Sequence, residues 1–161
     1  MQVSIRPASS DDTEALAQLS LLAWAPVFAS FRHVFGPTVY ALLYPDWEKQ
    51  QREVVERACD DRENTMVWVA EVDGTVAGFI AYTLNVAEKQ GMVELLAVHP
   101  EHQNRGVGTA LNRFALEQMK QRGMRLAGLS TGGDPGHAVA RRAYEKAGYV
   151  ALPIVWYYQE L

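Results

Sequence analysis

The sequence predicts a single α/β domain, in which a mixed but mostly antiparallel sheet of six or seven strands carries helices on both faces. Three apolar, strand-like segments follow one another between Met66 and Val98 with only short connections, which is typical of antiparallel neighbours. A helix-like segment and a further strand-like segment come next, which is the order expected of a parallel crossover. With 161 residues, the chain is long enough to bury one sizeable core.

The sequence of residues 1–65 predicts one short strand followed by helices. Val3 and Ile5 alternate with polar residues, as in a short strand. Asp11 and Glu14 resemble a capping box at the start of the helix that follows. That helix has one apolar face, which consists of Ala15, Leu16, Leu19, Leu22 and Ala23.

Aromatic side chains are frequent between Trp24 and Trp47, where we expect a short helix on each side of Gly36. These side chains either pack on the sheet or form the wall of a pocket, and both interpretations can hold for different residues. A charged helix from Trp47 to Arg62 follows. Its Cys59 is expected to be a small buried core residue.

The rest of the chain predicts strands joined first by short turns and then by helices. Asp73 and Gly74 form a hairpin turn, and Asp134 caps a late helix with Pro135 in its first turn. The predicted elements are strands at Met66–Val72, Thr75–Leu84 and Met92–Val98, a helix from Val107 to Arg122, a strand at Arg125–Ser130, a helix from Gly136 to Ala147, and closing strands at Tyr149–Ala151 and Val155–Gln159.

Composition and charge exclude several classes of protein. The net charge of −4 gives no reason to expect a nucleic-acid partner. Cys59 is the only cysteine, so no internal disulfide can form, which suits a reducing cytosol. Met1 to Asp12 lacks the basic and apolar regions of a signal peptide, and no run of membrane-spanning length is evident. We therefore expect a cytoplasmic protein without a membrane partner.

The most informative stretch is the one in which the strand ending at Val98 passes into the next helix. Gly106 and Gly108 open that helix and have no Cβ, so a bulky anion can approach backbone N–H groups there. Gln103 and Arg105 can add side-chain donors. The loop is neither a Walker loop nor a complete dinucleotide fingerprint. Taken alone, these residues fit a phosphate site and a tight turn without ligand about equally.

A wider pattern resembles one known family. Val-x-Pro at the strand end, followed by Gln-x-x-Gly-x-Gly from Gln103 to Gly108, resembles the acyl-CoA motif of the GCN5-related N-acetyltransferases (GNAT family). A second match, HAVARRAYEKAGY from His137 to Tyr149, resembles the last helix of that family. The resemblance covers the chain from about Met66 to its end. It implies acetyl-CoA as cosubstrate, an acyl-CoA-binding core at 66–161 and acceptor-side helices at 1–65.

The resemblance also implies which residues bind the cofactor. The strands that end near Val98 and Ser130 would diverge, and the pantetheine arm would lie in the gap between them. His137 stands where many relatives carry an Asn that contacts CoA, and its imidazole can donate in a similar way. The cofactor-binding residues implied are Leu96, Ala97 and Val98 for the arm, Gln103, Asn104, Arg105, Gly106, Val107, Gly108 and Thr109 for the pyrophosphate, and His137.

Two residues are candidates for the chemistry. Tyr144 matches the family's tyrosine and is expected to be the acid that protonates the departing thiolate, although a tyrosine can also simply pack there. Glu94 is the candidate base, since several relatives place a glutamate upstream of the cofactor segment; a solvated glutamate on the strand face is the alternative. Glu71, His99 and His102 are weaker rivals. No metal site is indicated, and Cys59 has no partner in a nucleophile pattern.

These residues imply an N-acetyltransferase that moves an acetyl group from acetyl-CoA to a primary amine, with small-molecule acceptors favoured, by direct transfer in a ternary complex. An acetyltransferase for protein N-termini or lysines is one alternative, and a non-catalytic acyl-CoA sensor is another. Trp156, Tyr157 and Tyr158 either cover a sheet edge or meet a second subunit of a homodimer.

Overall fold

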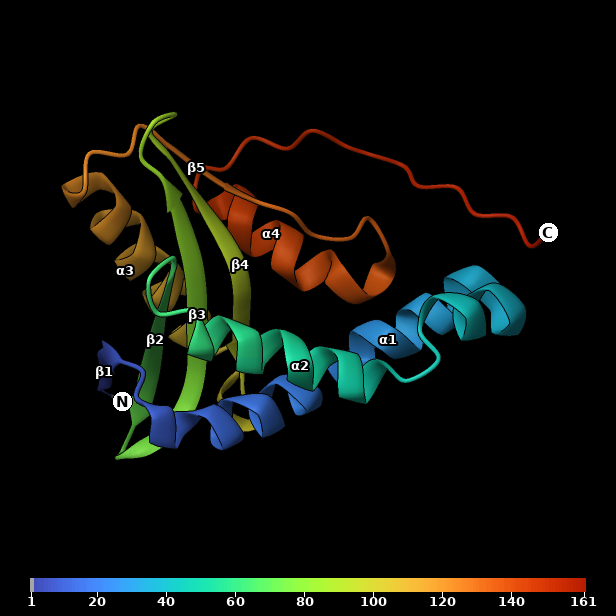
Figure 1. Ribbon diagram of the computed structural model, residues 1–161, viewed down its shortest axis with the longest axis horizontal. Helices are drawn as coiled ribbons and strands as arrows, with labels where there is room; N and C mark the ends of the chain where they lie inside the picture. The colour runs from blue at the N-terminus through green and yellow to red at the C-terminus, as the bar shows by residue number, and fades with distance from the viewer. Residues whose placement is uncertain (1) are drawn as a thin grey trace.

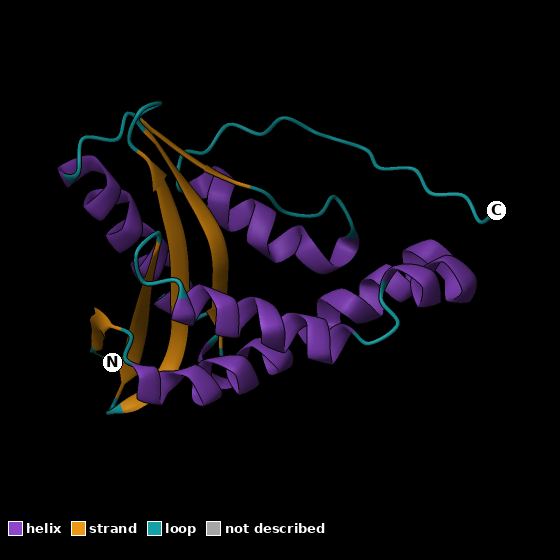
Figure 2. Cartoon of the chain, viewed as in Figure 1, coloured by secondary structure: helices purple, strands orange, loops and turns teal. Residues whose placement is uncertain are grey.

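The computed structural model describes residues 2–161 and contains one five-stranded sheet with helices on both of its faces (Figure 1; Figure 2). The strands lie in the order β1-β2-β3-β4-β5, each next to its neighbour in sequence. The first four are antiparallel and β5 is parallel to β4; the sequence predicts the antiparallel β2–β3–β4 meander and the parallel β5. The strands are β1 (Val3–Pro7), β2 (Thr65–Val72), β3 (Thr75–Asn85), β4 (Gln90–Val98) and β5 (Leu126–Leu129).

The predicted hairpin between β2 and β3 is confirmed. Asp73 and Gly74 both have left-handed backbones, with φ of 51° and 77°. Two consecutive left-handed residues form the turn whose twist matches that of the flanking strands.

The predicted count of six or seven strands is wrong, because the closing strands at Tyr149–Ala151 and Val155–Gln159 do not form. The last residues run as an extended segment away from the sheet (Figure 2). A strand needs a neighbour for its backbone N–H and C=O groups, and local alternation of apolar residues does not supply one.

Within residues 2–161, four α-helices and three short 3₁₀ helices complete the fold. The longest, α1, is interrupted at Gly36, whose φ of 73° and ψ of 170° are not helical. Two helical pieces are therefore present as predicted, but the first one is long and continues through Pro26. The helices are η1 (Ser10–Asp12), α1 (Thr13–Leu43), α2 (Trp47–Asp60), η2 (Pro100–His102), α3 (Val107–Gln121), η3 (Pro135–His137) and α4 (Ala138–Lys146).

The sheet separates two apolar cores. One lies under α3, where Val107, Leu111, Ala115 and Met119 are buried. The other lies under α1 and α2 and contains Leu16, Leu19, Val55 and Phe79. Since both faces of the central strands are covered, β3 and β4 show long apolar runs rather than simple alternation.

The segment Ser10–Leu43 is long and apolar enough, by length and composition alone, to cross a membrane, which sequence analysis did not anticipate. Leu16, Ala17 and Leu19 of this segment are packed into the core beneath the sheet. A core helix of a soluble protein passes the same test, so the finding is weak evidence for a membrane span.

Helix α4 is short and its apolar stripe is not covered. Val139, Ala143 and Ala147 are all exposed, although sequence analysis groups them as one apolar face. The chain turns after α4 at Gly148, with φ of 94°, and then leaves the sheet. Figure 1 shows this C-terminal segment passing α4 and ending beyond it.

Candidate active site

Strand β4 leaves its neighbour β5 halfway along its length. The last paired residues are Val93 and Leu129, while β4 continues to Val98. A β-bulge lies at the point of separation, because Leu95 opposes Ala81 and Val93 opposes Tyr82, which leaves Glu94 as the extra residue. A bulge bends a strand and increases its local twist. The gap that the family resemblance implied is therefore present.

The bulge also reverses the sides of β4. Val93 is buried in the core under α3, whereas Leu95, two residues later, is buried in the core under α1. In a regular strand these two side chains would point to the same face.

The far half of β4 presents free backbone groups to the gap. The His99 N–H donates to the Ala77 carbonyl on the β3 side, at 2.8 Å. Backbone groups alternate along a strand, so those of Val98 and Leu96 point to the gap and those of Ala97 point to β3. The Gln103 amide donates to the Val98 carbonyl at 3.0 Å. The Leu96 N–H and C=O and the Val98 N–H thus line the edge of the gap.

The start of α3 lies beside this edge. Asn104 and Gly106 have left-handed backbones, with φ of 59° and 87°. Ala110 is the first residue to donate within the helix, to Gly106 O at 2.9 Å, so the N–H groups from Val107 to Thr109 have no helical acceptor.

Space for a ligand remains over this helix start. A Cβ at Gly106 would meet nothing within 4 Å, and one at Gly108 would meet only Val98 Cγ2, at 3.4 Å. Free N–H groups, a positive helix end and open space suit a phosphate group.

A partly buried polar cluster joins α1 to the loop before α4. Ser30 Oγ donates to Asp134 Oδ2 at 2.6 Å, and the Gly136 N–H donates to the same oxygen at 2.9 Å. The other carboxylate oxygen, Oδ1, contacts His137 Nδ1. The Arg141 guanidinium donates to the Asp134 carbonyl at 2.7 Å. The predicted cap by Asp134 is confirmed, and it also joins two distant segments.

The carboxylate of Asp134 stays ionised in this cluster. Burial alone would raise its pKa, but the hydrogen bonds from Ser30 and His137 hold the pKa below its ordinary value. An ionised carboxylate only accepts hydrogen bonds, so the proton of the neutral His137 ring belongs on Nδ1. Nε2 is then an acceptor when the ring is neutral, so a neutral His137 does not donate through Nε2 in the way that the sequence analysis expected.

Sequence reasoning missed Ser30 and the contact between Asp134 and His137. Gly132 and Gly136 are the signal that could have indicated a crowded site. A Cβ on either glycine would overlap the carboxylate of Asp134, and one on Gly136 would lie 2.7 Å from Ser30 Cβ.

Tyr144 lies on α4 and is half-buried. Burial raises the pKa of its hydroxyl to about 12, with a smaller effect from Tyr149, so the phenol is protonated at neutral pH. The two rings meet edge-on at 5.8 Å. Tyr149 in turn donates to Asn112 Oδ1 on α3 at 3.1 Å, which ties the end of α4 to the helix that starts at the gap.

Glu94, the other catalytic candidate, is exposed at the bulge where the gap opens. Thr83 Oγ1 donates to its carboxylate at 3.1 Å.

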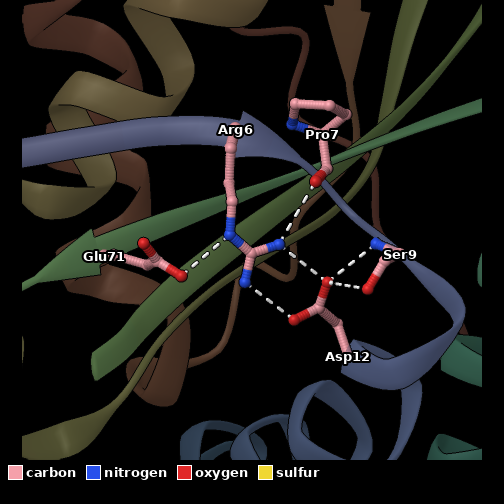
Figure 3. A network of polar contacts seen from close by, with 5 residues as sticks. All are labelled: Arg6, Pro7, Ser9, Asp12 and Glu71. Carbon is pink, nitrogen blue, oxygen red and sulfur yellow. Dashed lines mark hydrogen bonds and ion pairs between the residues drawn. The ribbon is translucent and has the colours of Figure 1, made fainter. Parts of the chain in front are cut away.

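One rival of Glu94, Glu71, is instead part of a structural network (Figure 3). Arg6 Nε donates to Glu71 at 2.8 Å, and its two terminal nitrogens donate to Asp12, each at 2.8 Å. The Ser9 N–H donates to Asp12 at 2.7 Å, so the capping box is formed by Ser9 and Asp12 rather than by Asp11 and Glu14. The Arg6 guanidinium holds the pKa of the Asp12 carboxyl well below its usual range.

The contacts of His99 and the burial of Cys59 do not favour a catalytic role for either residue. His99 Nδ1 accepts from the Glu101 N–H at 3.3 Å, which is the turn contact that flanks Pro100. Cys59 is buried, and burial raises the pKa of its thiol, which opposes a role as nucleophile. Cys59 borders a cavity of about 200 Å³ whose lining includes Pro7 and Trp68 and none of the residues of the gap.

The aromatic side chains of α1 pack on one another and on Tyr44 and Trp47, which follow α1 in the chain. Phe28 stacks on Trp47 with centroids 4.4 Å apart, and Phe31 stacks on Tyr44 at 5.4 Å. Phe31 also lies 5.5 Å from the ring of His137. The aromatic cluster therefore reaches the polar cluster of Asp134.

Comparisons with known proteins agree on one family. A family model described as "Acetyltransferase (GNAT) family" matches residues 31–149 of this chain. The mycothiol acetyltransferase of Streptomyces coelicolor is 31% identical over 107 residues, which are 63% of this chain and 34% of that protein. The chain spans less than half the length of the curated relatives that it matches.

Two solved structures share the fold over nearly the whole chain. The ribosomal-protein-alanine N-acetyltransferase of Brucella melitensis has a TM-score of 0.69 and 19% identity, and the match covers 99% of this chain and 100% of that one. The aminoglycoside N-acetyltransferase AAC(6')-Iy, solved with a CoA-containing bisubstrate analogue, has a TM-score of 0.67 and 16% identity, and covers 100% of this chain and 99% of that one. At 16% and 19% identity, these matches show that the fold is shared.

Proposed function

This chain belongs to the GNAT acetyltransferase family, and we propose that it transfers an acetyl group from acetyl-CoA to a primary amine of a small molecule. The observation that carries the proposal is the gap between β4 and β5, which opens beside the start of α3. An extended amide-containing arm and an adjoining pyrophosphate need these two neighbouring features.

The cofactor would be held by backbone groups on the β4 edge of the gap and at the start of α3. The Leu96 and Val98 edge of β4 would bond the amides of the pantetheine arm as an added strand would. The N–H groups from Gly106 to Thr109, with the side chains of Asn104 and Arg105, would surround the pyrophosphate. His137 would contact the cofactor through Nε2, since Nδ1 is occupied by Asp134.

The chemistry is a direct transfer in a ternary complex. The amine nitrogen forms a bond to the thioester carbonyl carbon, the C–S bond breaks, and the CoA thiolate leaves. Glu94 is proposed to take the proton that the attacking nitrogen loses, directly or through water. Tyr144, which is protonated at neutral pH, is proposed to donate its O–H to the departing sulfur.

The acceptor class is inferred from two relatives and from the aromatic cluster. The relative named for mycothiol and the aminoglycoside N-acetyltransferase favour a small molecule. The aromatic cluster of α1 and α2 suits the wall of an acceptor pocket, so we propose residues 1–65 as the acceptor side and 66–161 as the cofactor core of one domain. The likeness to a ribosomal-protein-alanine N-acetyltransferase favours a protein N-terminus as the second candidate. We also propose a cytoplasmic location, which suits a single buried cysteine.

The test is a thiol-release assay with acetyl-CoA and three acceptor sets: small primary amines, peptides with free N-termini, and peptides with internal lysine. We expect release with the small amines. Release with N-terminal peptides alone would favour the second candidate. Calorimetric binding of acetyl-CoA without release in any set would identify a sensor and contradict the transferase.

A further inference from the structure

The aromatic side chains of α1 and the start of α2 form a cluster that is only partly covered. Phe28, Phe31 and Phe35 are spaced by three and four residues, so they lie along one face of α1. Phe28 is buried, whereas the other rings are half-buried and leave part of their surface open. The cluster consists of Phe28, Phe31, Phe35, Tyr40, Tyr44 and Trp47. Half-open rings of this kind suit contact with a further apolar or aromatic group.

This aromatic cluster adjoins the residue proposed to contact the cofactor. The ring of Phe31 lies 5.5 Å from that of His137. Its neighbour Ser30 donates to Asp134 and accepts from the Gly136 N–H at 3.0 Å, which holds this part of α1 against the loop before α4. An acceptor whose amine lies at the gap would therefore have the aromatic cluster beside the rest of its body.

The cluster stands in a stretch of chain without carboxylates. Residues 15–45 contain neither Asp nor Glu, and Arg32 is the single Lys or Arg among them. Burial raises the pKa of the Tyr44 hydroxyl, so this phenol is uncharged at neutral pH. The Asp134 carboxylate is already occupied by donors of the chain, and Asp46 is exposed at the start of α2. A second ammonium group on the acceptor would lose water among these rings without a carboxylate to pair with.

The stacking of the rings also favours an aromatic group over a cation. Phe28 stacks on Trp47 with 21° between the ring planes, and Phe31 stacks on Tyr44 with 14°. A cation binds to the face of an aromatic ring, whereas the positive edge of one ring attracts the face of another. Stacking covers one face of each of these four rings. The cluster is therefore better suited to a further aromatic ring than to a cation.

We propose that the acceptor is a monoamine with an aromatic body, whose ring packs on the aromatic cluster while its amine lies at the gap. This inference rests on the acetyl transfer proposed above and adds the class of acceptor. It disfavours acceptors that carry several ammonium groups.

The first experiment compares kcat/KM for matched amines in the thiol-release assay with acetyl-CoA. Phenethylamine and cyclohexylethylamine differ in the aromaticity of the ring, and we expect phenethylamine to be preferred by about 3-fold or more, within the range of an aromatic pair. Pentylamine and cadaverine differ in one further amine. We expect pentylamine to be preferred by about 10-fold or more, although cadaverine has two reactive amines, because its second charge is unpaired.

The outcomes of this comparison separate the two proposals. Release with cadaverine as efficient as with pentylamine, or with cyclohexylethylamine as efficient as with phenethylamine, overturns the aromatic acceptor and leaves the transferase in place. An absence of release with every amine contradicts both.

The second experiment removes one ring from the cluster. Phe35 meets three other rings, and Phe35→Leu keeps an apolar side chain there. We expect KM for phenethylamine to rise by about 5-fold, while KM for pentylamine and for acetyl-CoA moves little. The matched control is Phe114→Leu on α3, a half-buried ring that packs on Trp68. An equal rise in KM for phenethylamine and pentylamine would overturn the inference, as would equal effects of the two variants. Phe31→Leu, measured in the same way, replaces Phe35→Leu if that variant does not fold.

Discussion

Ser30 and Asp134, which are 104 residues apart in sequence, share a 2.6 Å hydrogen bond that attaches α1 to the loop before α4. The same carboxylate contacts His137 Nδ1. A residue of α1, on the proposed acceptor side, thereby orients a residue proposed to contact the cofactor.

Asp134→Asn should disturb His137 without unfolding the protein. Asparagine no longer attracts the Nδ1 proton, so the ring should shift toward the tautomer that is protonated on Nε2. We expect kcat/KM for acetyl-CoA to fall by about 10-fold, the value of one hydrogen bond to a charged group. The ¹⁵N signals of the His137 ring report the tautomer. Asp46→Asn, on an exposed helix start, is the control, and an unchanged ring spectrum in the Asp134 variant would refute the assignment.

Gly108→Val should weaken acetyl-CoA binding more than it affects stability. The first carbon fits beside Val98 Cγ2, but the branched side chain would occupy the space over the free N–H groups. We expect the calorimetric Kd to rise by about 10-fold or more, which is the loss of one charge-assisted contact. Glu117→Val, at an exposed position of the same helix, controls for the introduced branched residue. Equal affinity in a folded Gly108 variant would rule out the phosphate site.

Glu94→Gln should lower kcat by roughly 10²–10⁴-fold, because glutamine cannot take the proton of the amine. Affinity for acetyl-CoA should be kept, since Glu94 lies at the bulge rather than along the free edge of β4. The acidic limb of the pH profile should disappear with the carboxylate. Glu88→Gln on the exposed turn is the matched control. Wild-type turnover in the Glu94 variant would assign the base to water or to another carboxylate.

Tyr144→Phe should lower kcat by about 10–10³-fold while KM moves little, because the hydroxyl acts mainly on the departing sulfur. A thiol has an ordinary pKa of about 8.5, so a phenol with a pKa of about 12 gives the sulfur a hydrogen bond more readily than a complete proton. Tyr157→Phe, at a side chain that is 90% exposed, is the control. Equal kcat in the Tyr144 variant and the wild type would exclude the acid role.

Asp12→Asn should destabilise the protein by about 1–3 kcal/mol at neutral pH, since Asp12 accepts hydrogen bonds from the Arg6 guanidinium. The pKa of Asp12 is lower in the folded than in the unfolded chain. Its stabilising effect is therefore complete above the unfolded pKa of about 4 and is lost as the pH falls below it. Urea unfolding from pH 7 to pH 3 should show the two proteins converging. A constant difference would contradict the linkage, and Asp11→Asn controls for the change at an exposed neighbour.

The sequence by itself determined the features that depend on neighbouring residues. The meander of β2, β3 and β4 follows from apolar runs divided by Asp73-Gly74, and the helix start at Val107 follows from Gly106 and the polar loop before it. Asp134 was recognisable as a cap because a cap acts within its own turn. Tyr144 was found through a motif on a single helix.

The tertiary structure alone decided the features that need two distant segments. The bulge at Glu94 is defined by the register between β3 and β4, which no local pattern shows. Because of the bulge, β4 contributes side chains to both cores and separates from β5. Ser30 gave no local signal, because its role depends on a carboxylate brought to it by folding. The closing strands were wrong for the same reason: alternation at Val155–Gln159 gives a tendency to form a strand, but pairing requires an edge within reach, and this chain directs the segment away from its own β5.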